Sequence, residues 1–233
     1  MKFPDPLISG RLVRRYKRFL SDVELSDGSV VVAHCANSGS MLGLTEPGYP
    51  VWLSPARNPE RKLKFTWELV DVGDSLVGIN TSLPNGIVAE AIANKKIREV
   101  AAYEGIRKEV RYGKNSRIDI LLEQDGLANC YVEVKSVTLS RDKGLAEFPD
   151  AVTKRGAKHL SELSDMVAQG HRAVMFFLVQ RSDCKKVDIA EDIDPDYKAA
   201  FAAAVGAGVE VLAYDCDLTN KGIQLRQSLP VIS

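Results

Sequence analysis

Three residues from two neighbouring stretches carry side chains that can act together chemically: Asp119, Glu133 and Lys135. Residues 116–123 and 131–138 have strong β character and flank a polar, glycine-containing stretch, which predicts a hairpin with a longer loop. Because side chains alternate between the faces of a strand, all three share one face of this hairpin. A symmetric loop places Asp119 opposite Lys135 and diagonal to Glu133. A bulge would shift this register by two residues without changing the face.

This arrangement predicts a site for a divalent metal ion. Two carboxylates at this spacing repel each other unless a cation lies between them. Mg2+ (or Mn2+) accepts two carboxylates while keeping positions for water and substrate phosphate. Lys135 is then placed to hold or activate an attacking water. The alternative is an exposed sheet face on which Lys135 and a carboxylate form a cross-strand ion pair.

A helix before the hairpin is expected to bring a third acid to this site. Residues 87–103 form a helix by propensity, with Asn85 near its start as a cap. Glu90 falls in an otherwise largely apolar stripe of that helix, so its carboxylate is expected to reach a cation, a metal or water at the edge of the sheet. The alternative is an ordinary surface glutamate that the helix dipole favours.

A second helix, expected over residues 151–169, follows the hairpin. Arg155 and His159 lie near its start and share a face, since they are four residues apart. They could bind or polarise a phosphate next to the metal, although a lone histidine is more often structural. Arg117 belongs to a stretch with a local excess of basic residues, which could hold a phosphodiester backbone beside the carboxylates.

A basic cluster near the start of the chain indicates contact with nucleic acid. Its five cations lie in a stretch of eight residues without an acid, and Tyr16 and Phe19 are interleaved with them or adjacent to them. On an open barrel face, such cations would follow a phosphate backbone and the rings would stack on bases. The alternative is a solvated basic strand whose aromatic rings belong to the core. The cations are Arg11, Arg14, Arg15, Lys17 and Arg18.

The composition restricts the classes of function. Thirty-one basic residues balance 31 acidic residues, so affinity for nucleic acid must come from local clusters and not from a global basic field. The four cysteines are widely spaced without a CxxC pair, which argues against a zinc ribbon or disulfide framework and predicts a cytoplasmic protein. The longest apolar run, residues 173–179, is too short to span a bilayer, and the amino-terminal residues lack the apolar core of a signal peptide.

The chain is expected to fold as two domains. Residues 1–82 contain several short β runs without helical periodicity, which predicts a small OB-like β-barrel, and an SH3-like barrel fits the pattern nearly as well. Residues 10–25 of this domain are expected to form one long strand. Residues 83–233 are expected to follow the order helix, three strands, helix, strand, helix, strand. That order predicts an α/β domain with a mixed central sheet flanked by helices.

This order, with Asp119 on the second strand and Glu133-Val134-Lys135 on the third, resembles the restriction-endonuclease-like PD-(D/E)xK fold. Ile118 stands where that motif usually has a proline. A closer resemblance, covering nearly the whole chain, is to the sugar fermentation stimulation protein family of bacteria and archaea. It rests on four segments: HCANSGSM at 34–41, NSRIDILLE at 115–123, YVEVKSVTL at 131–139 and FPDAVTKRGAKHL at 148–160.

The family resemblance implies an OB-like domain, here residues 1–82, joined to a PD-(D/E)xK nuclease-like domain, residues 83–233. It also implies that the protein binds DNA without sequence preference and regulates sugar (maltose) metabolism. It makes Arg155 and His159 stronger site candidates and residues 34–41 a candidate contact surface. It does not imply catalysis, because a fold carries no activity by itself.

Two hypotheses from different classes follow. In the first, the protein is a metal-dependent nuclease: Asp119 and Glu133 ligate Mg2+ (or Mn2+), Glu90 joins them directly or through water, and Lys135 positions the attacking hydroxide. In the second, the protein binds DNA without cutting it and acts as a regulator. The sequence leaves open the preference for DNA or RNA, the preference for single or double strands, and whether the protein is a monomer or a homodimer.

Overall fold

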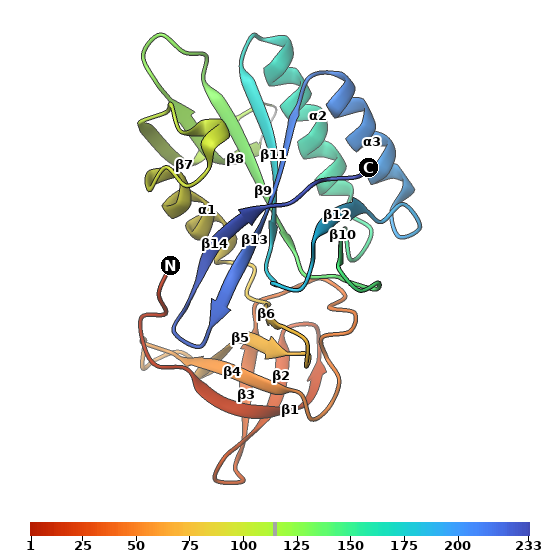
Figure 1. Ribbon diagram of the computed structural model, residues 1–233. Helices are drawn as coiled ribbons and strands as arrows, with labels where there is room; N and C mark the ends of the chain where they lie inside the picture. Colours follow the sequence, from red (N-terminus) through yellow and green to blue (C-terminus); the bar gives the residue numbers. More distant parts are fainter. Residues whose placement is uncertain (114–115) are drawn as a thin grey trace.

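The computed structural model describes residues 1–113 and 116–233, and Figure 1 shows a β-barrel at one end of the molecule and an α/β part at the other. The expectation of an OB-like barrel followed by a restriction-endonuclease-like domain with a mixed sheet is confirmed. Asn115, the first residue of the segment NSRIDILLE, lies outside the described residues. None of the helices in the described ranges combines the length and apolar character needed to cross a bilayer.

The barrel is formed by the first five strands and closes because β3 pairs in parallel with β5. Its core is fully buried and contains Trp67, Leu53 and Val23. A sixth strand, β6, extends the barrel sheet toward the α/β part. The bounds are β1 (Ile8–Tyr16), β2 (Leu20–Leu25), β3 (Val30–Cys35), β4 (Pro50–Pro55), β5 (Phe65–Asp71) and β6 (Leu76–Gly78).

The prediction of one long strand over residues 10–25 is wrong. The chain reverses between β1 and β2, so that Tyr16 pairs with Leu20. Lys17 and Arg18 take φ angles of 47° and 63° in this turn, a left-handed conformation that residues other than glycine adopt rarely. No glycine or proline signals the turn. The structure supplies the missing support, because Arg15 Nε donates a hydrogen bond to the backbone oxygen of Arg18 at 3.1 Å.

The α/β part is built on a six-stranded sheet in the order β14-β13-β11-β9-β8-β7. Its central strands β9, β11 and β13 are parallel and the outer pairings are antiparallel, which makes the sheet mixed. Two short strands, β10 and β12, form a separate parallel pair. The bounds are β7 (Gly105–Tyr112), β8 (Ser116–Glu123), β9 (Cys130–Val137), β10 (Leu145–Phe148), β11 (Arg172–Val179), β12 (Lys186–Ile189), β13 (Glu210–Thr219) and β14 (Gly222–Ser228).

Helices cover both faces of the sheet (Figure 1). Helix α1 (Pro84–Ala93) packs on one face, while α2 (Lys154–Ala168) and α3 (Pro195–Gly206) pack on the other. Strand β11 is therefore apolar along nearly its whole length, as expected for a strand buried on both sides. The first helix is shorter than predicted, because Lys95 takes a φ of 55° and the chain continues into a short 3-10 helix, η1 (Arg98–Val100).

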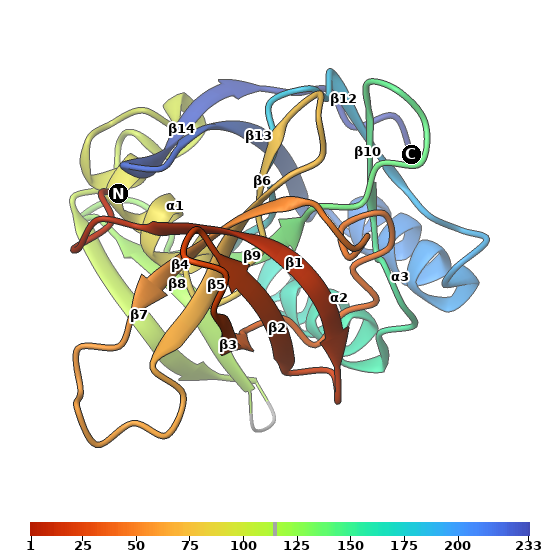
Figure 2. The same cartoon turned by 90° about the horizontal axis from the view of Figure 1, so that it is seen from below.

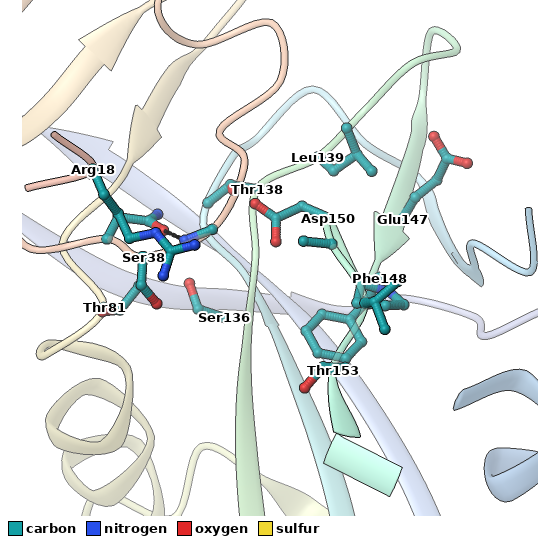
Figure 3. A pocket seen from close by; sticks show the side chains of 15 residues that line it. Arg18, Ser38, Thr81, Ser136, Thr138, Leu139, Glu147, Phe148, Asp150 and Thr153 are labelled. Atoms are coloured by element: carbon teal, nitrogen blue, oxygen red, sulfur yellow. Dashed lines mark hydrogen bonds between the residues drawn. The ribbon is translucent and has the colours of Figure 1, made fainter. Parts of the chain in front are cut away.

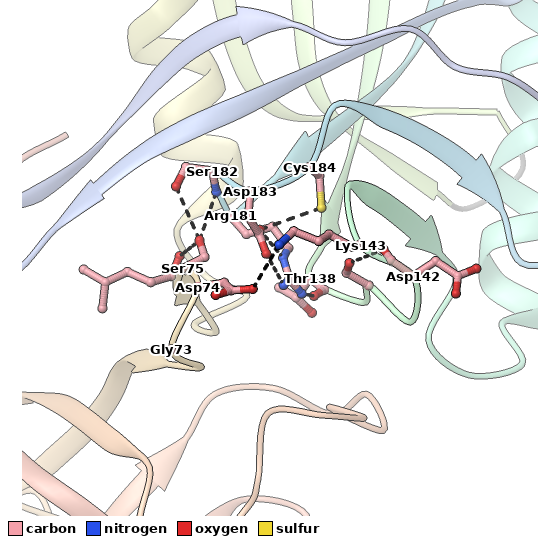
Figure 4. Close-up of polar contacts among 12 residues, drawn as sticks. Gly73, Asp74, Ser75, Thr138, Asp142, Lys143, Arg181, Ser182, Asp183 and Cys184 are labelled. Atoms are coloured by element: carbon pink, nitrogen blue, oxygen red, sulfur yellow. Dashed lines mark hydrogen bonds and ion pairs between the residues drawn. The ribbon is translucent and has the colours of Figure 1, made fainter.

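The barrel lies against one end of the large sheet, as the view from below shows (Figure 2). Polar contacts join the two parts at the tip of the barrel next to β6 (Figure 4). Gly78 N donates to the backbone oxygen of Gln180 at 2.9 Å, and Ser182 N donates to Ser75 Oγ at 3.2 Å. Nearby, the buried Arg181 donates to the backbone oxygen of Thr138 at 3.0 Å. These bonds hold the barrel next to the end of β9.

Candidate metal centre

The three predicted site residues lie where the hairpin ladder ends. Strands β8 and β9 pair through Ile120 opposite Val132, a register shifted by two residues from the symmetric one, which brings Asp119 level with Glu133. The strand face is unchanged. Beyond this pair the ladder stops, and the backbone nitrogen of Val134 donates to Asp119 Oδ2 at 2.8 Å. The Asp119 carboxylate therefore accepts a backbone hydrogen bond from β9 that a neighbouring strand would otherwise accept.

Asp119 is half-buried and held by two donors. Its Oδ1 accepts a hydrogen bond from Asn85 Nδ2 at 2.7 Å, and its Oδ2 accepts the bond from Val134. Burial, followed by the nearby charge of Glu133, raises the pKa of Asp119 from 3.8 to about 6. The charge of this carboxylate is thus poorly compensated by the protein itself, which is the electrostatic condition that favours a bound cation.

Glu133 is almost fully buried, with 2% of its surface exposed. Burial opposes its ionisation. The hydrogen bond from His159 and the positive charge of Lys135 nevertheless hold the pKa of Glu133 below its ordinary value. Lys135 Nζ lies 2.7 Å from Glu133 Oε1, and His159 Nδ1 contacts the same oxygen. Glu133 is therefore an ionised carboxylate with one oxygen occupied by protein donors.

The contacts of His159 indicate the roles of its two ring nitrogens. Arg155 Nε donates to His159 Nε2 at 3.2 Å, so Nε2 is the acceptor and Nδ1 is the nitrogen that carries a proton. That proton is donated to Glu133. The distance of 3.2 Å between Lys135 Nζ and His159 Nδ1 then joins two donors and is a contact without a hydrogen bond. Lys135 directs its bond to Glu133 instead.

The second oxygen of Glu133 supports a fit for a divalent ion. Glu133 Oε2 and the hydroxyls of Tyr112 and Tyr197 are buried without a hydrogen-bond partner among the described residues. After burial, the charge of Glu133 is the next cause that raises the pKa of both tyrosines. A buried carboxylate oxygen without a donor is costly, and a cation or water would satisfy it.

The donor set suits Mg2+ better than a metal that needs many protein ligands. Within residues 1–113 and 116–233, no group of three or more His, Cys, Asp and Glu side chains is arranged to hold a metal. The site offers Asp119 and the free oxygen of Glu133. Mg2+ is commonly bound by one or two carboxylates, with waters and substrate phosphate oxygens completing its coordination. The residues present fit that pattern.

Glu90 is not brought to this group, which corrects the expectation that it would ligate the metal. It is exposed on α1, and its Oε1 accepts a hydrogen bond from the amino group of Met1 at 2.9 Å. The amino-terminal segment runs beside β14, where Met1 reaches Glu90. The apolar stripe of α1 therefore ends in a surface ion pair.

Asn85 has a role that its position did not indicate. The sequence predicts a cap, yet α1 starts after Leu83 without a side-chain cap, and the Asn85 amide bonds Asp119 instead. A polar residue near a helix start is ordinarily interpreted as a cap. Only knowing that α1 packs beside β8 would have identified Asn85 as a partner of Asp119.

Three of the five cations in the basic cluster bond to other residues of the barrel domain, although Arg11 and Arg14 remain exposed on its surface. Arg15 donates to three carbonyl groups of residues 37–40 and to Arg18. Arg14 forms an ion pair with Asp22 at 2.7 Å, and Arg11 donates to a backbone oxygen. Their charges thus hold turns and strands in place.

The remaining cations are exposed. Lys17 and Arg18, in the turn between β1 and β2, make no side-chain hydrogen bond or ion pair with any described residue. Arg117 lies on β8 two residues before Asp119 and is also exposed. Arg155 is exposed on α2 and uses only Nε for His159. These four side chains can reach a phosphate without breaking a bond with the described residues.

Comparisons with known proteins point to the same family along the whole chain. The family model described as "Sugar fermentation stimulation protein RE domain" matches residues 82–222, and that of the "SfsA N-terminal OB domain" matches residues 13–79. A sugar fermentation stimulation protein homolog of Rhodospirillum rubrum is 57% identical and each chain is covered to 100%. A homolog of Rhodospirillum centenum is 58% identical, with 98% of each chain covered. The solved structure of Pyrococcus furiosus SfsA in complex with Ca2+ has a TM-score of 0.90 and 26% identity, covering 100% of this chain and 98% of that one.

Proposed function

Because this chain belongs to the sugar fermentation stimulation protein family, we propose that it binds DNA without sequence preference and hydrolyses its phosphodiester bonds with a divalent metal ion. We place the domain boundary at residues 82 and 83, with the OB-like barrel as a binding domain and the second domain as the nuclease. The observation that carries the proposal is the buried Glu133 Oε2, which has no described partner and belongs to the same group as Asp119 and Lys135.

Each side chain of the group has a distinct task. Asp119 and Glu133 would hold Mg2+ (or Mn2+), which when bound supplies positive charge to the phosphate and lowers the pKa of a bound water. Lys135 donates one hydrogen bond to Glu133 and keeps two N–H groups for the attacking water. His159 keeps Glu133 ionised. Arg155 has its two terminal nitrogens left for a phosphate oxygen, where charge develops during the reaction.

The solved structure of a relative supports the proposal that a divalent metal ion binds. The Pyrococcus furiosus protein was solved with Ca2+, and its chain matches this one along its full length. Calcium and magnesium both prefer oxygen ligands, and they differ in size and in the number of ligands they take. We therefore propose that the same kind of hard divalent ion binds here.

Plasmid nicking tests the proposal. Supercoiled plasmid and a labelled single strand are incubated with the protein in Mg2+, in Mn2+ and in EDTA. Cleavage is expected only with metal, and Asp119→Ala and Lys135→Ala are each expected to reduce the rate by at least about a hundredfold. Lys186→Ala, on β12 at the surface, is the matched control and keeps the wild-type rate. Undiminished cleavage in the Asp119→Ala, Lys135→Ala double variant would reject these assignments.

A second candidate, a non-catalytic DNA-binding regulator, is favoured by one observation. Lys135 and His159 already compensate the charge on Glu133 Oε1 without a metal. This hypothesis expects DNA binding that does not depend on Mg2+ and weakens steeply with salt. A salt titration of binding in Mg2+ and in EDTA, run beside the nicking assay, separates the two functions.

A further inference from the structure

A pocket of about 370 Å3 lies between the barrel and the segment that leads into α2 (Figure 3). Arg18 and Ser38 line it from the barrel side, and Ser136 lines it from the end of β9. Phe148 and Thr153 form the opposite wall. Ser136 follows Lys135 in the chain, and Thr153 caps the helix that carries Arg155 and His159. Two segments that carry the candidate metal centre, β9 and α2, therefore each contribute a neighbouring residue to the pocket wall.

The two acids on the pocket wall already have partners. Both oxygens of Glu147 accept hydrogen bonds from Arg141, at 2.6 and 3.0 Å. Asp150 Oδ2 accepts bonds from Met41 N and Ser40 Oγ, at 3.2 and 3.4 Å. The rest of the lining consists mainly of hydroxyl groups, small side chains and one aromatic ring. Such a lining suits a ligand with neutral polar edges and an apolar face.

Arg18 adds a positive charge at the rim. Figure 3 shows its side chain pointing into the pocket, and its guanidinium has no hydrogen-bond partner among the described residues. Its position is fixed by Arg15, which donates to the backbone oxygen of Arg18 and also to Asn37 and Gly39. Arg15 thus holds the backbone of the rim in place, and the Arg18 guanidinium remains available to bind a ligand. A guanidinium in this position matches a phosphate group.

We propose that this pocket binds one unpaired nucleotide of a nucleic-acid strand, with the phosphate on Arg18 and the base against Phe148. The inference rests on the proposed function, because it places this nucleotide next to the phosphodiester that the Asp119 group would cleave. A base that remains paired and stacked in a duplex cannot enter a pocket between two domains. Entry requires a single strand or a base that leaves the stack.

The surface outside the pocket suits the neighbouring nucleotide. Phe19 is adjacent to Arg18, is 45% exposed, and stacks on His34 with ring centroids 6.5 Å apart. An exposed ring beside cations is the arrangement that single-strand binding surfaces use to stack bases without reading their sequence. Arg18 therefore joins Phe19 to the pocket, because it is adjacent to Phe19 and lines the pocket rim.

Fluorescence anisotropy with a labelled oligonucleotide in EDTA tests the pocket without cleavage. Competitors are the same single strand, its duplex, the strand with one central abasic site, and free dAMP. Ser38→Trp fills the pocket from a residue without a hydrogen bond to any described residue, and Arg18→Gln removes the rim charge. Lys186→Gln removes one positive charge at the exposed surface of β12, from a residue that does not line the pocket. Thermal melting of each variant verifies folding.

Wild type is expected to prefer the single strand over the duplex, and the abasic site to weaken binding. Ser38→Trp and Arg18→Gln should each weaken single-strand binding by about tenfold, while Lys186→Gln leaves it unchanged. Folded variants that bind the single strand as wild type does would overturn the pocket assignment. So would displacement by dAMP alone, which would indicate a free nucleotide ligand. Neither result touches metal-dependent nicking, so failure of the pocket and failure of the proposed function remain distinguishable.

Discussion

At the scale of single residues, His159 is expected to act through Glu133 and not on the substrate. Its Nδ1 proton helps to keep a carboxylate ionised that is 2% exposed. His159→Ala should lower the free energy of unfolding by about 2 kcal/mol, because a buried charge loses a donor. It should also weaken Mn2+ binding by about tenfold or more.

The matched variant for this prediction is His159→Gln, whose amide can still donate to Glu133 Oε1. It should recover part of the stability and of the Mn2+ affinity. Urea denaturation and calorimetric Mn2+ titration measure both quantities. Equal losses in the alanine and glutamine variants would show that the hydrogen bond to Glu133 is not what His159 contributes.

The raised pKa of Asp119 predicts a pH dependence of stability in the metal-free protein. Its pKa is about 6 in the folded protein against a reference value of 3.8, so the folded state binds this proton more tightly than the unfolded state does. Stability contributed by Asp119 is therefore present at low pH and is lost as the pH rises from about 4 to about 6. The loss is at most about 1.4 kcal/mol per pH unit.

Urea denaturation in EDTA between pH 4 and pH 8, comparing wild type with Asp119→Ala, isolates this effect. The stability of wild type relative to the variant should fall up to about pH 6 and then stay level. Added Mg2+ should reduce the fall if the ion binds the ionised carboxylate. A difference that is flat, or that grows with pH, would contradict the raised pKa.

At the scale of elements, the start of α2 is expected to tolerate no side chain at Gly156. Replacing a helical glycine by alanine ordinarily stabilises a protein by up to about 1 kcal/mol. Here an added Cβ would lie 2.8 Å from Thr153 Cγ2 and 2.9 Å from Tyr197 Cε2. Tyr197 is fully buried and cannot move away freely. The steric cost of the added methyl group should exceed the gain in helix propensity, so Gly156→Ala should destabilise the protein by about 1–2 kcal/mol.

Gly86 provides the control, since it occupies the same third position in α1. Among the described residues, a Cβ there would meet Met1 Sδ alone, at 3.7 Å, which is an ordinary contact distance. Gly86→Ala should therefore be neutral or stabilising by a few tenths of a kcal/mol. Thermal melting of the two variants compares them directly. A stabilising Gly156→Ala would show that the wall formed by α3 yields more easily than the distances indicate.

The elements also show how far the sequence predicts this structure. Period-2 alternation located β8 and β9, and their shared face grouped Asp119 with Glu133. The register was off by two residues, because nothing in the sequence showed that Val134 would bond the Asp119 carboxylate in place of a strand partner. The turn at Lys17 has no glycine or proline to signal it, and the Arg15 side chain that bonds the Arg18 backbone is also bonded to a loop distant in the sequence.

Glu90 and Asn85 mark the limit for the site itself. Helical periodicity placed Glu90 on α1 and assigned Asn85 to a cap near its start, whereas α1 already begins at Pro84. Neither prediction could show which neighbours the two side chains would have. The amino-terminal segment brings Met1 to Glu90, and the packing of α1 beside β8 brings Asn85 to Asp119. Local patterns thus identify which side chains can do chemistry. Only the long-range arrangement decides which of them meet.

At the scale of the whole molecule, the balance of charges makes the distribution of cations decisive. With 31 acidic and 31 basic residues, the protein has no net field to attract a strand, and binding depends on cations without internal partners. Lys17, Arg18 and Arg117 meet this condition among the described residues. Arg155 bonds His159 through Nε alone and keeps its two terminal nitrogens for a phosphate. Arg14 does not meet the condition, because it pairs with Asp22.

The salt dependence of DNA binding measures how many of these cations contact phosphate groups. Each phosphate neutralised on a single strand contributes about −0.7 to the slope of log K against log salt concentration, so four contacts predict a slope of about −3. Lys17→Gln and Arg18→Gln should each make the slope shallower by about 0.7. Arg14→Gln should change it little, since that guanidinium is bonded to Asp22 at 2.7 Å. Anisotropy titrations of a labelled single strand over a range of salt concentrations measure these slopes. Arg14→Gln could instead make the slope shallower while Lys17→Gln and Arg18→Gln leave it unchanged. In that case β1, and not the turn that follows it, would be the surface that contacts the strand. The proposal that the strand passes Arg18 into the pocket would then be wrong.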